Sequence, residues 1–433
     1  MLPKDWLFLI PNQDNYILYA PLHKKTVRLT NEAALNSISI LDGNTPQSPI
    51  QNEIWNFFSQ NGLLVPPPEG INKNNKNLKI FLSITNKCNL RCLYCYANSG
   101  SNNKSMDFSI AKSALDYQIH RIIASNDDTI AVTFHGGGEA FVELALLKKI
   151  VIYINEAAKR LNLKTRIGCV TNATLITNDV AKWLAENFSH LSVSFDGPQE
   201  IQNTQRPAIS GSNSYDKAMS GIENLIEEKV NFSIRSTITN FSVTKMGEQV
   251  YFVQKHIFPY GGSITFEPVS LSGRAKNADN LGTDGVTFFE NYVSARQIGL
   301  QIGIDVTCSM DVFGSTKESF CGATQAALQC FTPDGKLSAC TRFTKKEDDG
   351  ASLYFYGNVN IDQVNIETDA RNRIIAFGTN YPTKCRTCYA RWNCQGGCSI
   401  ARYSTEQDNF EQSCFVTKEL LLYDLKRVLN HSS

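Results

Sequence analysis

From residue 79 to residue 266 the sequence alternates between short apolar runs and longer amphipathic stretches. Six apolar runs have the length and composition of strands: Lys79–Ile84, Thr129–Phe134, Thr165–Val170, Leu191–Phe195, Asn231–Ile238 and Ser263–Phe266. Between them, apolar residues such as Leu115, Ile119 and Ile122 recur at helical spacing. Alternating strands and helices predict parallel strands with right-handed crossovers. We therefore expect an α/β fold, an open (β/α)6 partial barrel, with its functional residues at the carboxyl ends of the strands.

We place this predicted barrel at residues 79–306, with a further helix over Thr283–Gly299 and a strand over Gln301–Val306 at its end. Shorter units flank it. Residues 1–65 are expected to form a small α+β unit of three strands followed by two helices, the first helix capped by Asn31. A run of prolines and then of polar residues predicts a linker at 66–78. Residues 307–433 show little regular periodicity. They are expected to be loop-rich, poor in a continuous apolar core, and to end in a helix over Phe415–Asn430.

Cysteine is over-represented, with 13 among 433 residues. The first residues, Met1 to Trp6, lack the pattern of a signal peptide, and no apolar run approaches the ~18 residues that span a bilayer. We therefore expect a cytoplasmic protein whose thiols are free to ligate metal. The net charge of +1 shows no excess of basic residues that would attract nucleic acid or an anionic membrane, so neither is expected as a partner.

Three cysteines follow the first predicted strand at the spacing C-x3-C-x2-C: Cys88, Cys92 and Cys95. Three thiolates on one loop can hold three corners of a cubane iron–sulfur cluster and leave the fourth iron open. An open iron can bind and reduce a ligand. The same triplet could instead be a zinc loop or three unrelated core cysteines.

This spacing, with Tyr94 before the last cysteine, resembles the radical S-adenosylmethionine (radical SAM) superfamily. The resemblance implies a [4Fe-4S] cluster on the three cysteines and S-adenosylmethionine as second cofactor. In that family an electron from the cluster cleaves S-adenosylmethionine and yields a 5′-deoxyadenosyl radical, which removes hydrogen from an unactivated C–H bond.

Residues at the predicted strand ends match family segments near the cofactor. The resemblance assigns these residues to S-adenosylmethionine: Tyr94, Gly137, Gly138, Glu139, Thr171, Asn172, Ser194, Asp196 and Arg235. Asp196 could instead make a turn, and Arg235 could instead form a salt bridge at the barrel rim. Ala140 stands where the family usually has proline. His135 is expected to be structural.

Three further polar residues complete this set of candidates. Glu267 and Arg274 are candidates on the substrate side, and Arg206 lies in a polar loop that could face the substrate.

Downstream cysteines resemble the SPASM extension of radical enzymes, which carries two auxiliary [4Fe-4S] clusters. By this correspondence Cys385, Cys388, Cys394 and Cys414 hold the outer cluster. Cys321, Cys340 and Cys398 hold the inner one, with Cys330 preferred to Cys308 as fourth ligand unless that position is open. Three clusters are thus expected. The C-x2-C pairs could instead bind zinc, and Cys169 is expected to be a core residue.

The resemblance implies oxidative modification of a ribosomally made precursor peptide, with flavodoxin or ferredoxin as reductant. The preferred product is a cross-link from a side-chain carbon to an aromatic ring, and residues 1–65 could bind a leader peptide as an added strand. The reaction could instead be sulfatase maturation, but that group tends to have aspartate after the second inner cysteine, where this chain has Thr341. Thioether formation and epimerisation also stay open as reactions. A non-catalytic metal-stapled binding module is the non-enzymatic hypothesis.

Overall fold

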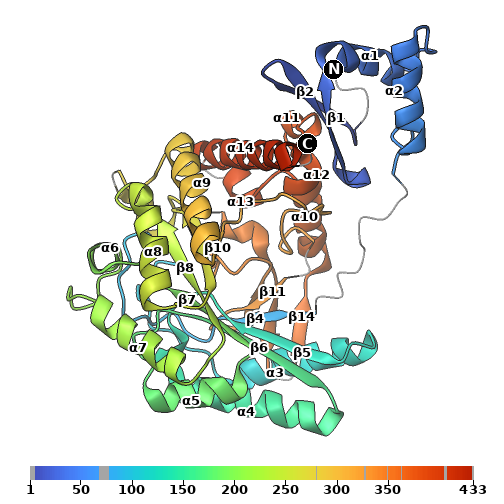
Figure 1. The fold of residues 1–433 in the computed structure, drawn as a ribbon. Helices are drawn as coiled ribbons and strands as arrows, with labels where there is room; N and C mark the ends of the chain where they lie inside the picture. The colour runs from blue at the N-terminus through green and yellow to red at the C-terminus, as the bar shows by residue number, and fades with distance from the viewer. Residues whose placement is uncertain are drawn as a thin grey trace.

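A single large sheet organises the molecule in the computed structural model, which describes residues 5–67, 78–278, 280–325, 328–348, 350–361, 363–403 and 407–431. Among these residues the sheet has eleven strands, in the order β10-β9-β8-β7-β6-β5-β4-β11-β12-β13-β14. The parallel strands are β4 (Ile80–Leu82), β5 (Thr129–Phe134), β6 (Lys164–Thr171), β7 (His190–Ser194), β8 (Phe232–Ile238), β9 (Gly262–Pro268) and β10 (Ile304–Thr307). Helices cover the outer face of this curved sheet (Figure 1), so the predicted parallel barrel is confirmed.

The helices of the barrel lie between these strands in the sequence. They are α3 (Phe108–Ala124), α4 (Leu144–Leu161), α5 (Asn178–Asn187), α6 (Gln199–Gln205), α7 (Tyr215–Glu227), α8 (Met246–His256) and α9 (Gly285–Ile302). A strand expected from residue 301 begins only at Ile304, because α9 runs to Ile302 and Gly303 ends it in the left-handed conformation at φ 79°. β10 then pairs with β9 and adds a seventh parallel strand.

Side chains alternate between the two faces of this sheet. The outward positions of β5, Ile130, Val132 and Phe134, are fully buried against the helices. The inward positions along the sheet are mostly small or polar, for example Thr133, Gly168 and Ser192. A closed barrel of this kind usually fills its interior with branched apolar side chains, whereas here the inner face leaves space for a ligand.

The C-terminal part shares the core of the barrel, which corrects the expectation that it lacks one. β11 (Gln329–Phe331) pairs in parallel with β4, and β12 (Lys336–Ser338), β13 (Phe355–Asn360) and β14 (Gln363–Ile366) extend the sheet in antiparallel fashion. Phe331, Leu337 and Tyr356 are fully buried in the main core. The helices here are α10 (Thr368–Thr379), α11 (Thr383–Arg386), α12 (Arg391–Cys394), α13 (Ser399–Tyr403) and α14 (Gln407–His431).

The N-terminal unit has the expected three strands and two helices: β1 (Phe8–Asn12), β2 (Asn15–Ala20), β3 (Lys25–Thr30), α1 (Asn31–Leu41) and α2 (Pro49–Gln60). The cap of α1 is Thr30 rather than Asn31, because the Thr30 side chain accepts a hydrogen bond from Ala33 N. One face of the sheet packs on α1 and α2. The other packs on α14, which lies beside it in Figure 1, through Leu421 and Leu425.

Two further expectations concern the linker at 66–78 and membrane-spanning segments. Most of the linker expected at 66–78 lies outside the described residues, which resume at residue 78. Among the helices that the structure describes, none is long and apolar enough to cross a membrane.

Candidate active site

The cysteine loop leaves the carboxyl end of β4 and brings three thiols together. Burial raises the pKa of Cys88 to about 12, and the neighbouring Cys92 and Cys95 thiolates add to this shift. Burial also raises the pKa of Cys92, and the charges of Arg206 and Arg274 oppose that rise. The predicted triplet is therefore one set of thiols, with two cations beside it that would compensate thiolate charge.

Arg274 holds the cysteine loop by its backbone. Its Nη1 donates to Cys92 O at 2.7 Å and its Nη2 donates to Ser99 O at 2.8 Å. Its own backbone N–H donates to Cys95 O at 3.0 Å. In the described contacts Arg274 thus fixes the loop, while its predicted place on the substrate side stays a prediction.

The glycine run after β5 packs directly on the cysteine loop. Gly138 N donates to Thr85 O and Glu139 N donates to Lys87 O, both at 2.8 Å. A Cβ built on Gly138 would lie 1.8 Å from Lys87 O. Glycine is needed here because two backbones touch, whereas the motif by itself suggested close approach of a ligand.

Glu139 joins three parts of the site from a buried position. Its Oε1 accepts from Thr171 Oγ1 and its Oε2 accepts from Asn172 N, both at 2.8 Å. Asn172 Nδ2 in turn donates to Asn89 Oδ1, beside the first cysteine, at 3.0 Å. Burial raises the pKa of the Glu139 carboxyl and these hydrogen bonds lower it. The structure therefore brings the predicted residues from β5 and β6 to the cysteine loop.

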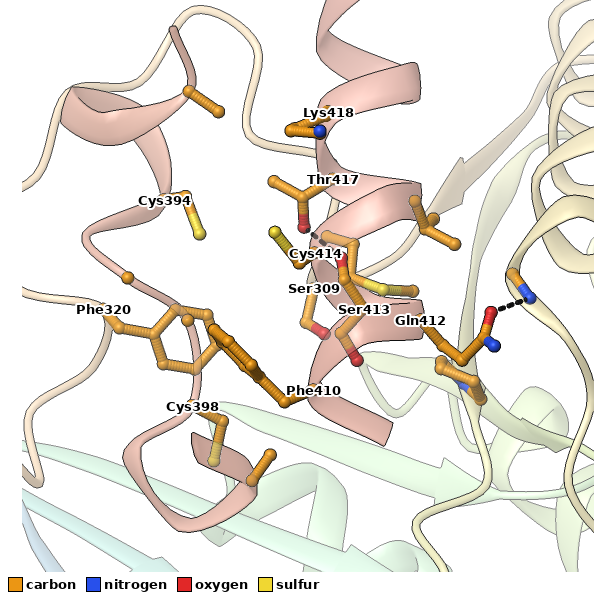
Figure 2. A pocket seen from close by; sticks show the side chains of 18 of the residues that line it. Ser309, Phe320, Cys394, Cys398, Phe410, Gln412, Ser413, Cys414, Thr417 and Lys418 are labelled. Carbon is orange, nitrogen blue, oxygen red and sulfur yellow. Dashed lines mark hydrogen bonds between the residues drawn. The ribbon is translucent and has the colours of Figure 1, made fainter. Parts of the chain in front are cut away.

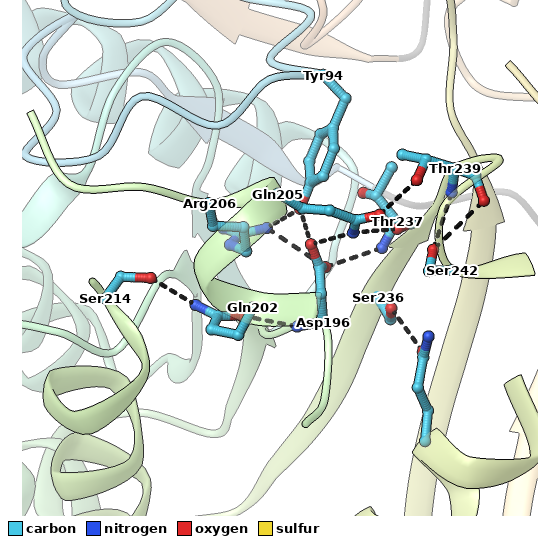
Figure 3. A network of polar contacts seen from close by, with 11 residues as sticks. Tyr94, Asp196, Gln202, Gln205, Arg206, Ser214, Ser236, Thr237, Thr239 and Ser242 are labelled. Carbon is cyan, nitrogen blue, oxygen red and sulfur yellow. Dashed lines mark hydrogen bonds and ion pairs between the residues drawn. The ribbon is translucent and has the colours of Figure 1, made fainter. Parts of the chain in front are cut away.

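A second buried network holds Tyr94, which belongs to the cysteine loop (Figure 3). Tyr94 Oη donates to Asp196 Oδ2 at 2.5 Å, and Arg206 Nη1 donates to Tyr94 Oη at 2.5 Å. Gln205 Nε2 and Thr237 N also donate to the Asp196 carboxylate, at 2.8 and 3.1 Å. Hydrogen-bond donors of the protein thus surround the Asp196 carboxylate. Its contact with Tyr94 positions the cysteine loop. Arg206 is buried beside Tyr94 and Asp196, and its suggested place facing the substrate stays a prediction.

Arg235 and Glu267 lie on the inner face of neighbouring strands. Arg235 Nη2 is 3.5 Å from Glu267 Oε1, and half of the arginine side chain is exposed. Glu267 also accepts hydrogen bonds from Ser309 N at 3.1 Å and Ser309 Oγ at 2.7 Å. The rim salt bridge considered for Arg235 is therefore present. Ser194 lies one strand away at the end of β7, in register with Arg235.

His135 lies at the same end of the barrel. Burial and the charges of Arg235 and Lys79 lower its pKa to about 4, so the ring is neutral at pH 7. Its ring meets that of Phe81 edge to face at 6.4 Å. These contacts fit the structural role expected for this histidine.

The inner auxiliary set brings together Cys321, Cys330, Cys340 and Cys398. Burial raises the pKa of Cys330 and of Cys340. Thiolates at 340 and 321 add to the shift of Cys330, and thiolates at 398 and 321 add to that of Cys340. Cys308 instead adjoins Glu267 and Asp311 and receives a hydrogen bond from Tyr292. Of the two candidates for a fourth ligand, Cys330 is the one that lies with the other three. Cys169 is buried on the outer face of β6, as expected for a core residue.

The outer set lines a cavity of about 230 Å³ between α12 and α14. The pKa of Cys394 is raised by burial and by Cys385, Cys388 and Cys414. The four thiols therefore lie close together at this cavity. Figure 2 shows Cys394 and Cys414 reaching into the cavity from facing helices. Within the described residues, no three cysteine, histidine or acidic side chains are close enough to hold one metal ion.

Sequence patterns alone missed several residues of the site. Gln205 supports Asp196, but nothing in its sequence context marks it. Tyr96 lies between the cysteine loop and the inner set, since thiolates at both Cys95 and Cys340 raise its pKa. Its position directly after the third cysteine was an available signal.

Comparisons with known proteins agree with this geometry. Residues 82–243 match the model of the Radical SAM superfamily. An uncharacterized protein of Methanocaldococcus jannaschii is 35% identical over 189 residues, which cover 43% of this chain and 61% of that protein. The cysteine-type anaerobic sulfatase-maturating enzyme of Clostridium perfringens is 23% identical over 360 residues, covering 79% of this chain and 95% of the relative.

Solved structures share the fold at low sequence identity. The structure of native anSMEcpe with bound AdoMet has a TM-score of 0.66 at 20% identity and covers 82% of this chain and all of its own. Streptococcus suis SuiB bound to the precursor peptide SuiA has a TM-score of 0.51 at 14% identity and covers 91% of this chain and 94% of its own.

The fold, the cysteine loop and the family match show that residues 82–243 form the Radical SAM domain of an enzyme. The cysteines that follow this domain are SPASM-like.

Proposed function

We propose that this enzyme oxidatively modifies a side chain of a peptide substrate, and that its product is an intramolecular cross-link to an aromatic ring. The observation that carries the proposal is the cavity of about 630 Å³ on the inner face of the barrel, lined mostly by polar side chains, Tyr96 and Arg235 among them. Relatives support a peptide as substrate, since SuiB is described with a bound precursor peptide and anSMEcpe with a bound peptide and AdoMet.

The chain provides residues suited to three [4Fe-4S] clusters and S-adenosylmethionine. Cys88, Cys92 and Cys95 would hold the first cluster. Arg206 fits an anionic group there, because its Nε is buried with no acceptor among the described residues. When bound, this cluster and S-adenosylmethionine supply a carbon radical that removes hydrogen from an unactivated C–H bond.

The auxiliary clusters would occupy the two further sets of thiols. The four thiols at 321, 330, 340 and 398 would hold the inner cluster. Those at 385, 388, 394 and 414 would hold the outer one.

The chain itself orients the cofactors and excludes water. Two buried networks, around Glu139 and Asp196, and the clamp of Arg274 fix the loop that carries the first cluster. Gly137, Gly138, Ser194 and Arg235 stay the proposed contacts of S-adenosylmethionine from the strand ends. Preorganised groups of this kind contribute by holding reacting atoms in line.

The test is anaerobic reconstitution followed by iron analysis and an assay for 5′-deoxyadenosine with dithionite. We expect about twelve irons per chain, as three cubanes require, and cofactor cleavage. Cys92→Ala should abolish cleavage while the auxiliary iron remains. Cys388→Ala should retain uncoupled cleavage but lower the yield of modified peptide. Zinc in place of iron, without cleavage, would refute the proposal.

Sulfatase maturation is the second candidate, because the full-length relatives found include enzymes named for it. Mass spectrometry of a co-expressed precursor peptide separates the two reactions. A cross-linked peptide lacks two hydrogens and resists fragmentation between the joined residues. A formylglycine product carries an aldehyde that reacts with a hydrazide probe.

A further inference from the structure

The inside of the barrel contains a cavity of about 630 Å³ with an unbalanced charge. Its cationic lining residues are Lys79, Arg166 and Arg235, and none of its described lining residues is acidic. Arg235 has Glu267 at 3.5 Å. Among the described residues, neither Lys79 nor Arg166 has a carboxylate partner. Two cations therefore share this cavity without an anion.

Strand register places Lys79 and Arg166 in one layer at the amino-terminal end of the barrel. Ile80 pairs with Val132, so Lys79 lies beside Ala131, and Ala131 pairs with Arg166. Two strand spacings separate the cations by roughly 10 Å. The methyl group of Ala131 lies between them and leaves the middle open. A carboxylate above Ala131 would be within reach of both long side chains.

The two cations, Lys79 and Arg166, interact electrostatically in this arrangement. Burial and the charge of Arg166 lower the pKa of Lys79. The Lys79 ammonium lies 4.8 Å from the ring centre of Phe81, which orients it over the inner face. Like charges held in a partly buried cavity favour an opposite charge from a ligand, because an ion pair there removes the repulsion.

We propose that Lys79 and Arg166 form a binding site for a carboxylate of the peptide substrate, at the end of the barrel opposite the cysteine loop. The inference rests on the proposed function and names a property of the peptide. Lys79 and Ser83 flank β4 and are four positions apart, about 13 Å along a strand. An extended peptide covers this distance in about four residues. The carboxylate thus lies about four residues from the modified position.

The test measures binding by calorimetry to the reconstituted full-length protein. The probes are blocked hexapeptides with one phenylalanine and, four residues away, either glutamate or glutamine. A third probe is the glutamine peptide with a free C-terminal carboxylate. We expect the glutamate peptide to bind about tenfold more tightly than its glutamine counterpart, as one charge-assisted contact provides. Preference for the third probe instead would assign the site to a peptide C-terminus.

The variants Lys79→Gln and Arg166→Gln should each remove this preference. The matched control, Lys182→Gln with Arg160→Gln, changes two cations on the outer helices and should retain it. Lys79→Glu with Arg166→Glu should reverse the preference toward a lysine peptide, and a thermal melt shows whether this variant folds. No discrimination in the wild-type protein, or discrimination that persists in both single variants, would overturn the inference.

The outcome is separable from that of the proposed function. Selective binding of a carboxylate peptide without cleavage of S-adenosylmethionine would refute the radical reaction and keep the site. Cofactor cleavage without carboxylate preference would keep the reaction and refute the site.

Discussion

Individual residues of the site act mainly by holding one loop in place. Arg274 bonds the backbone at Cys92 and Ser99, and Tyr94 is held by Asp196 and Arg206. The sequence identified most of these residues but assigned several of them to the ligand, since a motif shows which residues matter and not what they contact.

Gly138→Ala tests the contact between the glycine run and the cysteine loop. A Cβ there would lie 1.8 Å from Lys87 O, and overpacking against backbone cannot be relieved by a rotamer change. We expect a loss of about 3 kcal/mol in the free energy of unfolding and less iron at the first cluster. Urea unfolding and iron analysis of the reconstituted protein measure both.

The control for this substitution is Gly282→Ala. A Cβ at Gly282 would lie 3.5 Å from Leu271 Cδ1, an ordinary contact. This variant should unfold like the wild type. Wild-type stability in Gly138→Ala would show that the two loops separate easily, against the geometry described.

At the scale of elements, the predicted helices and strands are present because their periodicity is local. Helix ends were less predictable. α9 runs three residues beyond the expected Gly299, to Ile302. A single residue in the left-handed conformation, Gly303, separates it from β10. Short elements such as β11 and β12 have three residues each and carry too little pattern to be seen in the sequence. β11 forms because the edge of β4 offers it hydrogen-bonding partners, and β12 then pairs with β11 and β13.

Asp284 caps α9, a helix that packs against both α8 and α14. Its carboxylate accepts a hydrogen bond from Thr287 N at 2.9 Å. Asp284→Ala should lower the free energy of unfolding at pH 7 by about 1 kcal/mol, while Asp284→Asn keeps an acceptor and most of the stability. Urea unfolding of the three proteins measures the difference.

The pH dependence of this cap has a defined sign. Hydrogen bonds from Thr287 lower the pKa of Asp284 below its ordinary value of 3.8. Its contribution is therefore fully present above the unfolded-state pKa and is lost as pH falls through the lowered pKa. A gap between wild type and Asp284→Ala that widened on acidification would contradict this role.

On the scale of the whole molecule, the N-terminal sheet is sandwiched between its own helices and the cysteine-rich part. Tyr19 Oη donates to Asn393 Oδ1 at 2.9 Å, beside Cys394 of the outer set. Trp392 Nε1 donates to Asp5 O at 2.6 Å. The unit that is a candidate for leader binding therefore contacts the segment that carries the outer cluster. The alternating apolar residues of β1 and β2 serve both faces, whereas their pattern in the sequence predicted only a small separate domain.

Leu425→Ala tests this docking. Leu425 is fully buried in the cluster of side chains between α14 and the N-terminal sheet. We expect a loss of about 2–5 kcal/mol from the cavity left behind and faster hydrogen exchange in β1 and β2. Leu300→Ala, at a residue that is 67% exposed on α9, is the control. Unchanged exchange in the N-terminal strands would mean that they do not depend on α14.

The sequence by itself determined the types of the long elements and their parallel arrangement, which follow from apolar periodicity and crossover handedness. The cysteine sets were predicted from the resemblance to a known family. Only the tertiary structure decided that β11 joins β4, that Cys330 and not Cys308 lies with the inner thiols, and that Lys79 and Arg166 share one layer. Those outcomes depend on strand register and on packing between segments hundreds of residues apart, for which one sequence carries no local signal.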